Sequence, residues 1–319
     1  MIHDDLLYRV ATAYHIDKKN QREIASDLGV SRVQISKYLK MAKARGLVKV
    51  EVIPPVISSE ELQRYKTEYK KHFALRDVLV CPSYNAHDTL FRSLLRQAEG
   101  YVFSNFGPGE MVVGIGWGRT TYEFIENMSP IDRSLWQIVP LAGGSSRASK
   151  KYFNTNHLVH ALSEKLRAQS QLLYLPLISD TKAGRRSISV GDEYSQIVKL
   201  WDALDLIICS VGSDLTGSPL FTDAVIGSDY LRKLSKSHAV GDMLTHFYDV
   251  EGNIMEIGIE DRMINVSLAQ LLKAKNRLVI VSGVEKTDAI LGALRAKLVD
   301  ILIIDQTTAM QVLDQNRKK

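Results

Sequence analysis

The sequence predicts an α/β protein, in which a small N-terminal winged helix-turn-helix domain precedes a larger domain built on a doubly wound, mostly parallel sheet. Three observations predict this fold. A helix, a tight turn and a second helix follow one another near the N-terminus, a pair of prolines then interrupts the chain, and from Val78 onward short apolar runs alternate with helical segments. The chain has 319 residues, enough for two domains. We place the boundaries at 1–53, 54–74 and 75–319, and the middle piece is a linking or oligomerisation helix.

The helix-turn-helix begins at Asn20, which is a suitable N-cap for a helix over Gln21–Leu28. Gly29 follows where the chain must turn, because glycine enters the left-handed region at little cost. Ser31 precedes the second helix, and Gln34 lies three residues on, as a capping box requires. This spacing is typical of a DNA-binding motif, although an ordinary helical hairpin would share it. The inward faces carry Ile24, Leu28, Val30, Ile35, Tyr38 and Leu39.

Positive charge is concentrated on this motif. From Lys18 to Lys49, nine basic residues stand against two acidic ones, a net charge of +7 in a chain whose total is +5. The rest of the chain therefore carries a small negative charge. Such an asymmetry is the electrostatic footprint of a nucleic-acid partner, here double-stranded operator DNA. A lysine-rich, solvated helix face is the alternative.

The outward face of the second helix carries the residues that we expect to contact DNA. In the major groove Gln34 is able to read adenine, Arg32 guanine and Val33 a thymine methyl group. The lysines would bind phosphates, which gives affinity without sequence information. The expected DNA-binding residues are Gln21, Arg32, Val33, Gln34, Ser36, Lys37, Lys40 and Lys43.

Three flanking segments complete this part of the chain. Residues 6–16 form an amphipathic segment, which would pack behind the motif through Leu6, Leu7, Val10 and Tyr14. Residues 47–52 alternate apolar with polar and predict a strand, as in the wing of a winged helix. Residues 58–73 predict the linking helix, with an apolar face of Leu62, Tyr65, Tyr69 and Phe73. That face either packs on its own domain or mediates self-association.

The larger domain shows the alternation expected of a parallel, doubly wound sheet. Strands are predicted at 78–81, 111–115, 136–141, 172–177, 206–211, 278–282 and 301–305. Helices are predicted between most of them, at 89–106, 120–128, 155–169, 193–204, 288–297 and 308–316. Residues 216–264 interrupt this alternation, and we assign no element to them.

The clearest candidate site is the glycine-rich loop within residues 112–121, where a strand leads through the loop into a helix. Glycines let backbone N–H groups approach an anion, and a helix N-terminus adds partial positive charge. Thr120 is expected to cap the helix, with Glu123 completing a capping box. The spacing matches neither the dinucleotide fingerprint nor the nucleoside-triphosphate loop, so a phosphate on a small molecule fits better than NAD or ATP. A strand–helix turn without a ligand is the alternative.

Other predicted strands end in small or polar turns, and the carboxyl ends of parallel strands meet at one edge of a sheet. The further candidates along that rim are Gly144, Ser145, Gly212, Asp242, Gly283 and Lys286. Asp242 and Asp249 would either bind sugar hydroxyls or serve as solvated turn acids. His157 and His160 lie three residues apart on a predicted helix, but no third ligand accompanies them, so we expect no metal site and no cofactor.

Several classes of protein do not fit the sequence. No stretch is long and apolar enough to span a membrane, and the N-terminus lacks the layout of a signal peptide, so a cytoplasmic location is expected. The two cysteines, Cys81 and Cys209, lie far apart in apolar runs and are expected to be buried free thiols.

Taken in order, the motifs resemble a known family. The helix-turn-helix and linking helix are followed by GIGWGRTT, LAGGSS, SVGS, AVGDM, EDR at Glu260–Arg262, and SGVEKTDAILGALRAKLVDILIIDQTTAMQVL. This order is similar to that of the SorC/DeoR-type bacterial transcriptional regulators over essentially the whole chain. The resemblance implies a C-terminal sugar-phosphate-binding domain like ribose-5-phosphate isomerase and glucosamine-6-phosphate deaminase, and an assembly that is usually a homotetramer.

The resemblance also implies roles for individual residues. Phosphate would be held by Gly116, Gly118, Arg119, Thr120 and Thr121, and the sugar by Asp242 and Lys286. One member of the family traps its ligand as a Schiff base on a lysine, and the resemblance does not choose between Lys150 and Lys151 for that lysine. We therefore expect a non-enzymatic regulator of a carbohydrate operon that a phosphorylated sugar controls. A sugar-phosphate isomerase or deaminase with a DNA-binding domain, and a constitutive DNA-binding protein with a vestigial sheet domain, are the alternatives.

Overall fold

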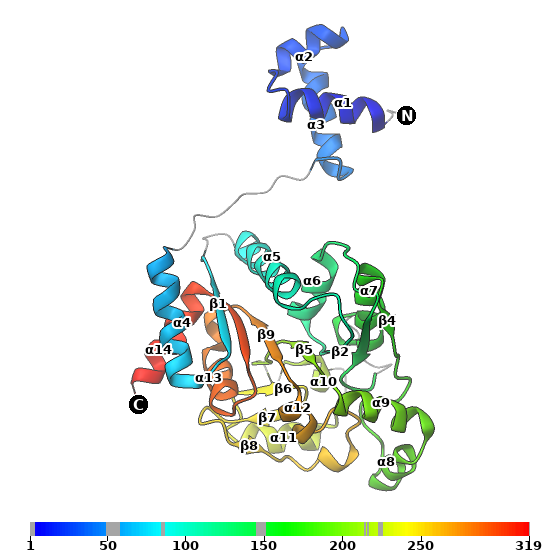
Figure 1. Cartoon of the computed structure of the whole chain (residues 1–319), viewed down its shortest axis with the longest axis vertical. Coiled ribbons are helices and arrows are strands. Elements are labelled where there is room, and N and C mark those ends of the chain that lie inside the picture. The colour runs from blue at the N-terminus through cyan, green and yellow to red at the C-terminus, as the bar shows by residue number, and fades with distance from the viewer. Residues whose placement is uncertain are drawn as a thin grey trace. The chain divides into compact units, whose positions relative to one another are not determined.

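Figure 1 shows the computed structural model of the protein. It describes residues 4–48, 58–83, 87–144, 151–213, 215, 217–222 and 226–318. The chain divides into two compact units, Met1–Ile53 and Pro54–Lys319. Within the described ranges no helix is long and apolar enough to cross a membrane.

The first unit is built from three helices, α1 (Asp4–His15), α2 (Gln21–Leu28) and α3 (Arg32–Ala44). Their buried faces form a small core of Leu7, Val10, Ala11, Ile24, Ala25, Ile35, Tyr38 and Ala42. Gly29 ends α2 with φ 63°, so the left-handed turn predicted between the two motif helices is present. Tyr14 was expected to pack behind the motif, but it lies at the end of α1 and is 37% exposed, so that prediction is wrong.

The caps of the two motif helices differ from the prediction in one respect. The Asn20 side chain accepts bonds from the N–H groups of Arg22 and Glu23, and the Glu23 side chain accepts from the N–H of Asn20. The complete capping box is therefore on α2. On α3 the Ser31 hydroxyl accepts from the N–H of Gln34 at 3.2 Å, which is only one half of the predicted box. Residues 49–52 of the predicted wing lie outside the described residues.

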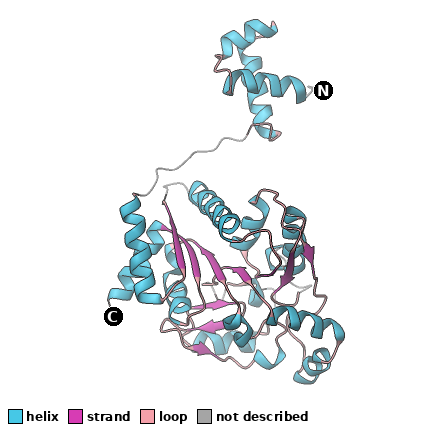
Figure 2. Ribbon diagram, in the orientation of Figure 1, coloured by secondary structure: helices cyan, strands magenta, loops and turns pink. Residues whose placement is uncertain are grey.

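The second unit contains a seven-stranded sheet with the order β1-β10-β9-β5-β2-β3-β4 (Figure 2). All of its neighbouring strands run parallel. The strands are β1 (Asp77–Cys81), β2 (Met111–Ile115), β3 (Trp136–Pro140), β4 (Gln169–Ser170), β5 (Leu206–Cys209), β9 (Arg277–Val281) and β10 (Ile301–Asp305). Parallel strands buried on both faces read as continuous apolar runs, which is why most of these strands were predictable.

Helices cover both faces of the sheet (Figure 1). One face packs against α5 (His87–Asn105), α6 (Arg119–Asn127) and α7 (Thr155–Leu166). The other packs against α4 (Ser59–Phe73), α9 (Asp192–Asp202), α12 (Leu268–Lys273), α13 (Thr287–Arg295) and α14 (Gln306–Arg317). Successive strand residues point to opposite faces of the sheet. In β5, Ile207 packs on the face covered by α4 and α9, and Ile208 packs on the face covered by α5, α6 and α7.

The linking helix α4 packs on its own unit. Tyr65, Tyr69 and Phe73 are at most 9% exposed, and the Tyr69 hydroxyl donates to the Ala309 carbonyl of α14 at 3.0 Å. Of the two interpretations of this apolar face, packing within the domain is the one observed. The face is therefore not available as a free surface for self-association.

The predicted strand at 172–177 is wrong. The edge strand β4 is only Gln169–Ser170, and the apolar residues that follow it instead bury Leu173 and Leu177 in two different cores. The unassigned region holds α10 (Pro219–Thr222), α11 (Ser228–Lys236) and a small antiparallel sheet of β6 (Gly241–Met243), β7 (His246–Tyr248) and β8 (Ile254–Met255). Short helices α8 (Lys182–Ser189), η1 (Lys151–Phe153), η2 (Glu260–Arg262) and η3 (Val284–Lys286) complete the fold.

The three-helix core of the first unit makes a direct prediction. Ile35 is fully buried on α3, whereas Val33 on the same helix is 68% exposed. We expect Ile35→Ala to destabilise this unit by about 2–4 kcal/mol, because it removes three buried carbon atoms from a very small core. Val33→Ala should change its stability by less than about 0.5 kcal/mol. Loss of helical circular dichroism on heating measures both, and equal effects would contradict the packing described.

Candidate functional site

The topology of the large sheet singles out one place on its rim. From β2 the chain proceeds outward to β3 and β4, whereas from β5, the other neighbour of β2, it proceeds to β9 and β10. Ligands of open α/β sheets bind outside the carboxyl ends of the strands at such a reversal of strand order. The loops after β2, β5 and β9 meet there, joined by the β6–β7 hairpin.

The loop after β2 approaches β5 very closely. A Cβ atom on Gly116 would lie 2.8 Å from Cβ of Cys209 and 3.0 Å from Cδ2 of Leu244, so a side chain would collide with both. The N–H of Gly116 donates to the Ile208 carbonyl, and that of Gly118 donates to the Tyr152 carbonyl at 2.9 Å. Both amides predicted to bind phosphate are thus already engaged. These glycines bring the backbone close to neighbouring residues instead of supplying free donors.

Helix α6 begins directly after this loop, and it does so without a side-chain cap. Its N-cap is Gly118, with φ 123°, a region in which L side chains are strained. The prediction that Thr120 caps the helix with Glu123 is wrong, because the helix starts one residue earlier and Thr120 is buried inside its first turn. The N–H groups of Arg119, Thr120 and Thr121 have no intrahelical acceptor at this end, so they face the rim as donors.

Thr121 adds an unusual feature to the first turn of α6. Thr121 is 1% exposed, and its hydroxyl has no hydrogen-bond partner among the residues that the structure describes. The Ser210 hydroxyl, immediately after β5, is also buried and unpartnered. Buried hydroxyls are normally hydrogen-bonded, because leaving one unpaired costs free energy. Two such groups beside one rim indicate a place that a polar ligand can complete.

The loop after β5 is tied to the β6–β7 hairpin. The N–H of Gly212 donates to the Asp242 carbonyl at 2.9 Å, and the N–H of Asp242 donates to the Gly212 carbonyl at 3.1 Å. A Cβ atom on Gly212 would lie 2.2 Å from Oδ1 of Asp242, so the carboxyl rests directly on the glycine. Oδ2 of Asp242 accepts from the N–H of Thr245 at 3.1 Å. Burial raises the pKa of Asp242 to about 6, and the bond from Thr245 partly opposes that rise.

The loop after β9 contributes a second cation to the rim. Lys286 is the last residue of η3 and precedes α13, whose N-terminus also lacks a side-chain cap. Burial lowers the pKa of the Lys286 ammonium, Glu285 opposes this, and the Arg119 guanidinium lowers the pKa further. The charge of Arg119 thus acts on Lys286, although the two residues come from segments far apart in sequence. Two cations near the start of a helix that lacks a side-chain cap are groups that can bind an anion.

A further polar residue, Asp305 at the end of β10, orders the adjoining part of the rim. It is 2% exposed and accepts from the N–H and hydroxyl of Thr308 and from the N–H of Gly283. Asp305 is thus the N-cap of α14 and holds the loop after β9 in place. The sequence placed Asp305 on the rim without revealing this role, which requires strands β9 and β10 to be neighbours.

The remaining candidates lie at the margins of the site. The N–H of Gly144 donates to the Leu175 carbonyl, and the Gly144 carbonyl accepts from Leu177, so its backbone is part of the fold. Ser145 and Lys150 lie outside the described residues, and Lys151 opens η1. Asp249 accepts bonds within its own turn, from Glu251 and Asn253. A pocket of about 320 Å³ adjoins the rim and is lined by Ser213, Leu215, Ala239, Val240, Glu285, Asp288 and Ala289.

The two histidines considered as metal ligands have other contacts. The His157 ring stacks on Tyr122, with ring centroids 6.3 Å apart, and His160 faces Glu164 on the surface of α7. The part of the chain that the structure describes contains no group of three side chains able to hold a metal ion.

The expected DNA-binding residues occupy one outward side of the helix-turn-helix. Arg32, Val33, Lys37, Lys40 and Lys43 are exposed. Gln21, Gln34 and Ser36 are half-buried, each near the start of its helix or at the edge of the exposed face. Ile35, Tyr38 and Ala42, by contrast, are buried on the opposite side of α3.

Comparison with known proteins agrees with this architecture. Residues 58–314 match the family of sugar-binding domains. The chain is 26% identical to the sorbitol operon regulator of Klebsiella pneumoniae over 310 residues, which is 97% of each protein. It is 27% identical to the deoxyribonucleoside regulator of Bacillus subtilis over 313 residues, again 97% of each. The chain belongs to the SorC/DeoR family of sugar-binding transcriptional regulators.

The SorC/DeoR fold extends over both units. The crystal structure of the full-length sorbitol operon regulator SorC from Klebsiella pneumoniae matches with a TM-score of 0.72 and 26% identity, over 97% of this chain and 99% of that one. The structure of a transcriptional regulator from Streptococcus pneumoniae matches the fold with a TM-score of 0.74 at 22% identity, over 81% of this chain. These relatives are transcriptional regulators and not enzymes, so the isomerase or deaminase alternative is set aside.

The buried carboxyl of Asp242 makes the stability of this SorC/DeoR protein depend on pH. Its pKa is about 6 in the folded protein against an ordinary value of 3.8, so the folded state holds this proton more tightly. The stability that the proton contributes is present below pH 3.8 and is lost as pH rises to about 6. We expect Asp242→Asn to raise the free energy of unfolding by on the order of 3 kcal/mol at pH 7.5 and by about 1 kcal/mol at pH 4.5.

Urea denaturation at the two pH values measures this difference. Asp180→Asn, which changes an exposed carboxyl, is the matched control and should show no comparable pH-dependent gain. An equal gain from Asp242→Asn at both pH values would show that Asp242 is not the group held protonated by burial.

Proposed function

We propose that this sugar-responsive regulator controls a carbohydrate-metabolism operon by binding operator DNA through its first unit and a phosphorylated sugar at the rim of its second. The observation that carries the effector proposal is the uncapped N-terminus of α6, where Arg119 begins the helix and its charge acts on Lys286. The Arg119 side chain is exposed and Lys286 is half-buried, and an anion between these two side chains would be attracted by both. A phosphate group, with its charge and several acceptor oxygens, supplies what this arrangement lacks.

The sugar part of the ligand is assigned to the hairpin side of the rim. The carboxyl of Asp242 accepts hydrogen bonds from hydroxyl groups, and it lies on Gly212 next to the loop that carries Ser210. The unpartnered hydroxyls of Ser210 and Thr121 would complete their bonding to the bound molecule. The backbone N–H groups of Gly144 and Gly283 already donate within the protein, so of these three candidates only Ser145, which lies outside the described residues, remains for a hydroxyl contact.

The names of the relatives are consistent with a small phosphorylated carbohydrate as the effector, but they do not identify the compound. One is a regulator of a sorbitol operon and another a deoxyribonucleoside regulator, so polyols and pentose derivatives both belong in a screen. Binding of the effector would alter the assembly, for which we propose a homotetramer, and thereby its affinity for operator DNA. Linkage then requires DNA to change the effector affinity by the same factor.

A thermal-shift screen tests the effector proposal. Phosphorylated pentoses, hexoses and hexitols are compared with the same sugars lacking phosphate, because a ligand that binds only the folded state must raise the melting temperature. We expect Lys286→Ala to weaken a hit by about 10-fold to 100-fold, as loss of a charge-assisted bond does. Lys199→Ala, at an exposed lysine of α9, is the control. Equal stabilisation by phosphorylated and unphosphorylated sugars would contradict the phosphate site.

Thr121→Val gives a sharper form of the same test. The hydroxyl is buried without a partner, so replacing it by a methyl group should leave the ligand-free protein as stable or stabilise it by about 1 kcal/mol. The same variant should bind the hit more weakly. A purely structural threonine would instead lose stability and keep its ligand.

The DNA proposal separates base contacts from phosphate contacts. The operator is obtained by selection from random duplexes. Gln34→Ala should reduce the preference for operator over random DNA by about 5-fold to 100-fold, because hydrogen bonds from the glutamine side-chain amide to an adenine edge distinguish adenine from the other bases. Lys40→Ala should weaken binding to both kinds of DNA alike and lower the slope of log affinity against log salt by about 1. A Gln34→Ala variant that loses equal affinity for all sequences would contradict its role in base recognition.

A further inference from the structure

The turn between β6 and β7 has an unfavourable backbone for its sequence. Leu244 and Thr245 form a two-residue hairpin loop with φ values of 54° and 67°. Positive φ at both central positions is the geometry of a type I′ turn, which strongly favours Asn-Gly. Leucine is costly there and a β-branched threonine more so, because the Cβ atom clashes with the backbone. Such a conformation persists only when the surrounding structure holds it.

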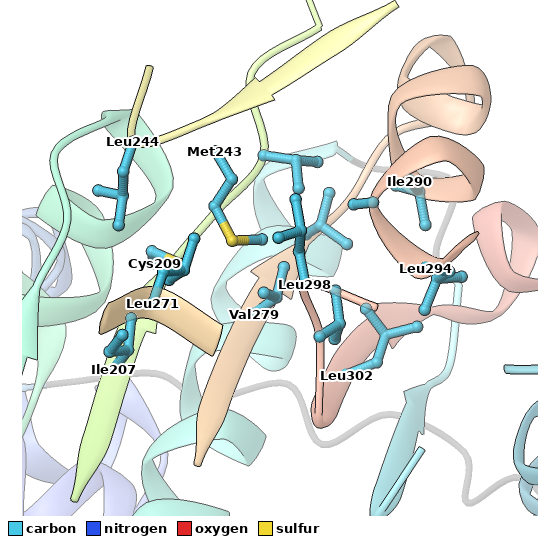
Figure 3. Packing of buried hydrophobic residues seen from close by; sticks show 14 of the residues in the cluster. Ile207, Cys209, Met243, Leu244, Leu271, Val279, Ile290, Leu294, Leu298 and Leu302 are labelled. Carbon is cyan, nitrogen blue, oxygen red and sulfur yellow. The ribbon is translucent and has the colours of Figure 1, made fainter. Parts of the chain in front are cut away.

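Several contacts hold this turn. Leu244 and Thr245 are 4% and 7% exposed, the N–H of Thr245 donates to Oδ2 of Asp242, and the Thr245 hydroxyl donates to the Leu244 carbonyl at 2.6 Å. Figure 3 shows Leu244 and Met243, from this hairpin, close to Cys209 of β5. Leu244 also lies over Gly116, so the strained turn contacts both the candidate sugar carboxyl and the loop that precedes α6.

Asn265 ties this turn to another part of the rim. Its side-chain amide donates to the Leu244 carbonyl at 3.0 Å and contacts the Thr245 hydroxyl at 2.9 Å. Its backbone is fixed beside the end of β3. Asn265 forms an antiparallel bridge with Ala142. The residues on either side of Asn265 are also bonded to this segment: the Ile264 carbonyl accepts from the N–H of Gly143, and the N–H of Val266 donates to the Leu141 carbonyl. A half-buried amide on a rigid segment thus bonds both residues of the turn.

We propose that Asn265 is a positioning residue for the effector: it holds the Leu244–Thr245 turn in its strained form, and the turn orients the Asp242 carboxyl toward the sugar. The inference rests on the proposed function, in which Asp242 binds the sugar hydroxyls. Without the Asn265 amide the turn relaxes toward negative φ, the Thr245 N–H leaves Asp242, and Leu244 no longer lies over Gly116. The side-chain hydrogen bonds of Asn265 go to the turn and not to Arg119 or Lys286, so its loss should affect the sugar part of the site more than the phosphate part.

The first test separates the two parts of the ligand. Inorganic phosphate probes the anion site alone, and the best sugar phosphate of the thermal-shift panel probes both parts. We expect Asn265→Ala to leave the affinity for inorganic phosphate within about 2-fold and to reduce the advantage of the sugar phosphate about 10-fold, as loss of a pair of hydrogen bonds does. Asn265→Asp, which keeps the shape but removes the donating amide, should act in the same direction.

Rescue and a matched control distinguish positioning from general stability. Replacing Thr245 by Gly removes the β-branched side chain that disfavours positive φ and keeps Leu244 in the core, so Thr245→Gly should restore sugar-phosphate affinity in the Asn265→Ala background. Asn276→Ala removes another half-buried amide, which bonds the Asp205 carbonyl at the opposite end of the sheet. This control should leave both affinities unchanged. Failure of the rescue, or an equal loss for both ligands, would overturn the positioning role.

The second test needs no ligand and so separates this inference from the proposed function. The pH-dependent gain in stability from Asp242→Asn is compared in the wild-type and Asn265→Ala backgrounds. If the turn opens, water reaches the carboxyl and the gain should shrink by about half or more. An unchanged gain would overturn the inference. If no sugar phosphate binds better than inorganic phosphate, the proposed effector is wrong, and the pH comparison still decides the role of Asn265.

Discussion

The backbone pair between Gly212 and Asp242 is the contact on which the rim of the large unit depends. Two hydrogen bonds join the loop after β5 to strand β6, and they bring a separate antiparallel hairpin onto the edge of the parallel sheet. A Cβ atom at position 212 would lie 2.2 Å from Oδ1 of Asp242, so a larger residue there would displace the Asp242 carboxyl. Through this pair the carboxyl becomes buried, and the hairpin turn reaches Gly116 on the next loop.

Burial then acts in opposite directions on the two titratable groups of the rim. It raises the pKa of Asp242 and lowers that of Lys286, so both groups shift toward their neutral forms in the ligand-free protein. A bound phosphate would favour the charged form of Lys286. The charged forms of both groups are therefore poorly stabilised in the ligand-free protein. The hydroxyls of Thr121 and Ser210 likewise have no hydrogen-bond partner among the described residues.

The helices that begin along the rim differ in whether a side chain caps their N-terminus. Asp305 caps α14 with its own carboxyl and also holds Gly283, so that end is satisfied within the protein. Helix α6 begins at Arg119 without a side-chain cap, whereas α13 continues directly from η3, and the N–H of Thr287 already donates to the Val284 carbonyl. In sequence the three starts look alike, since each follows an apolar strand with a polar turn. Which end is capped depends on local dihedral angles and on neighbouring strands.

The sequence by itself determined the parts whose signals are local. Caps, a glycine turn and apolar spacing predicted α2 and α3, and β-branched runs predicted six of the seven strands of the sheet, because parallel strands buried on both faces need such runs. Strand β4 and the hairpin of residues 241–248 were missed, since two- or three-residue strands carry too little pattern to recognise. The residue pattern pointed to the glycine-rich loop and to Asp242 and Lys286 as rim candidates, and the family resemblance, which the comparisons confirm, assigned them to a common ligand.

Only the tertiary structure decided how these residues meet. It showed that the charge of Arg119 acts on Lys286, placed Asp242 on Gly212, and showed that the amides of Gly116 and Gly118 are already used. It also revealed Asn265, whose amide holds a turn that its own sequence disfavours. The physical reason is that hydrogen-bond partners and burial depend on segments distant in the chain, and these become neighbours only when the strand order is set.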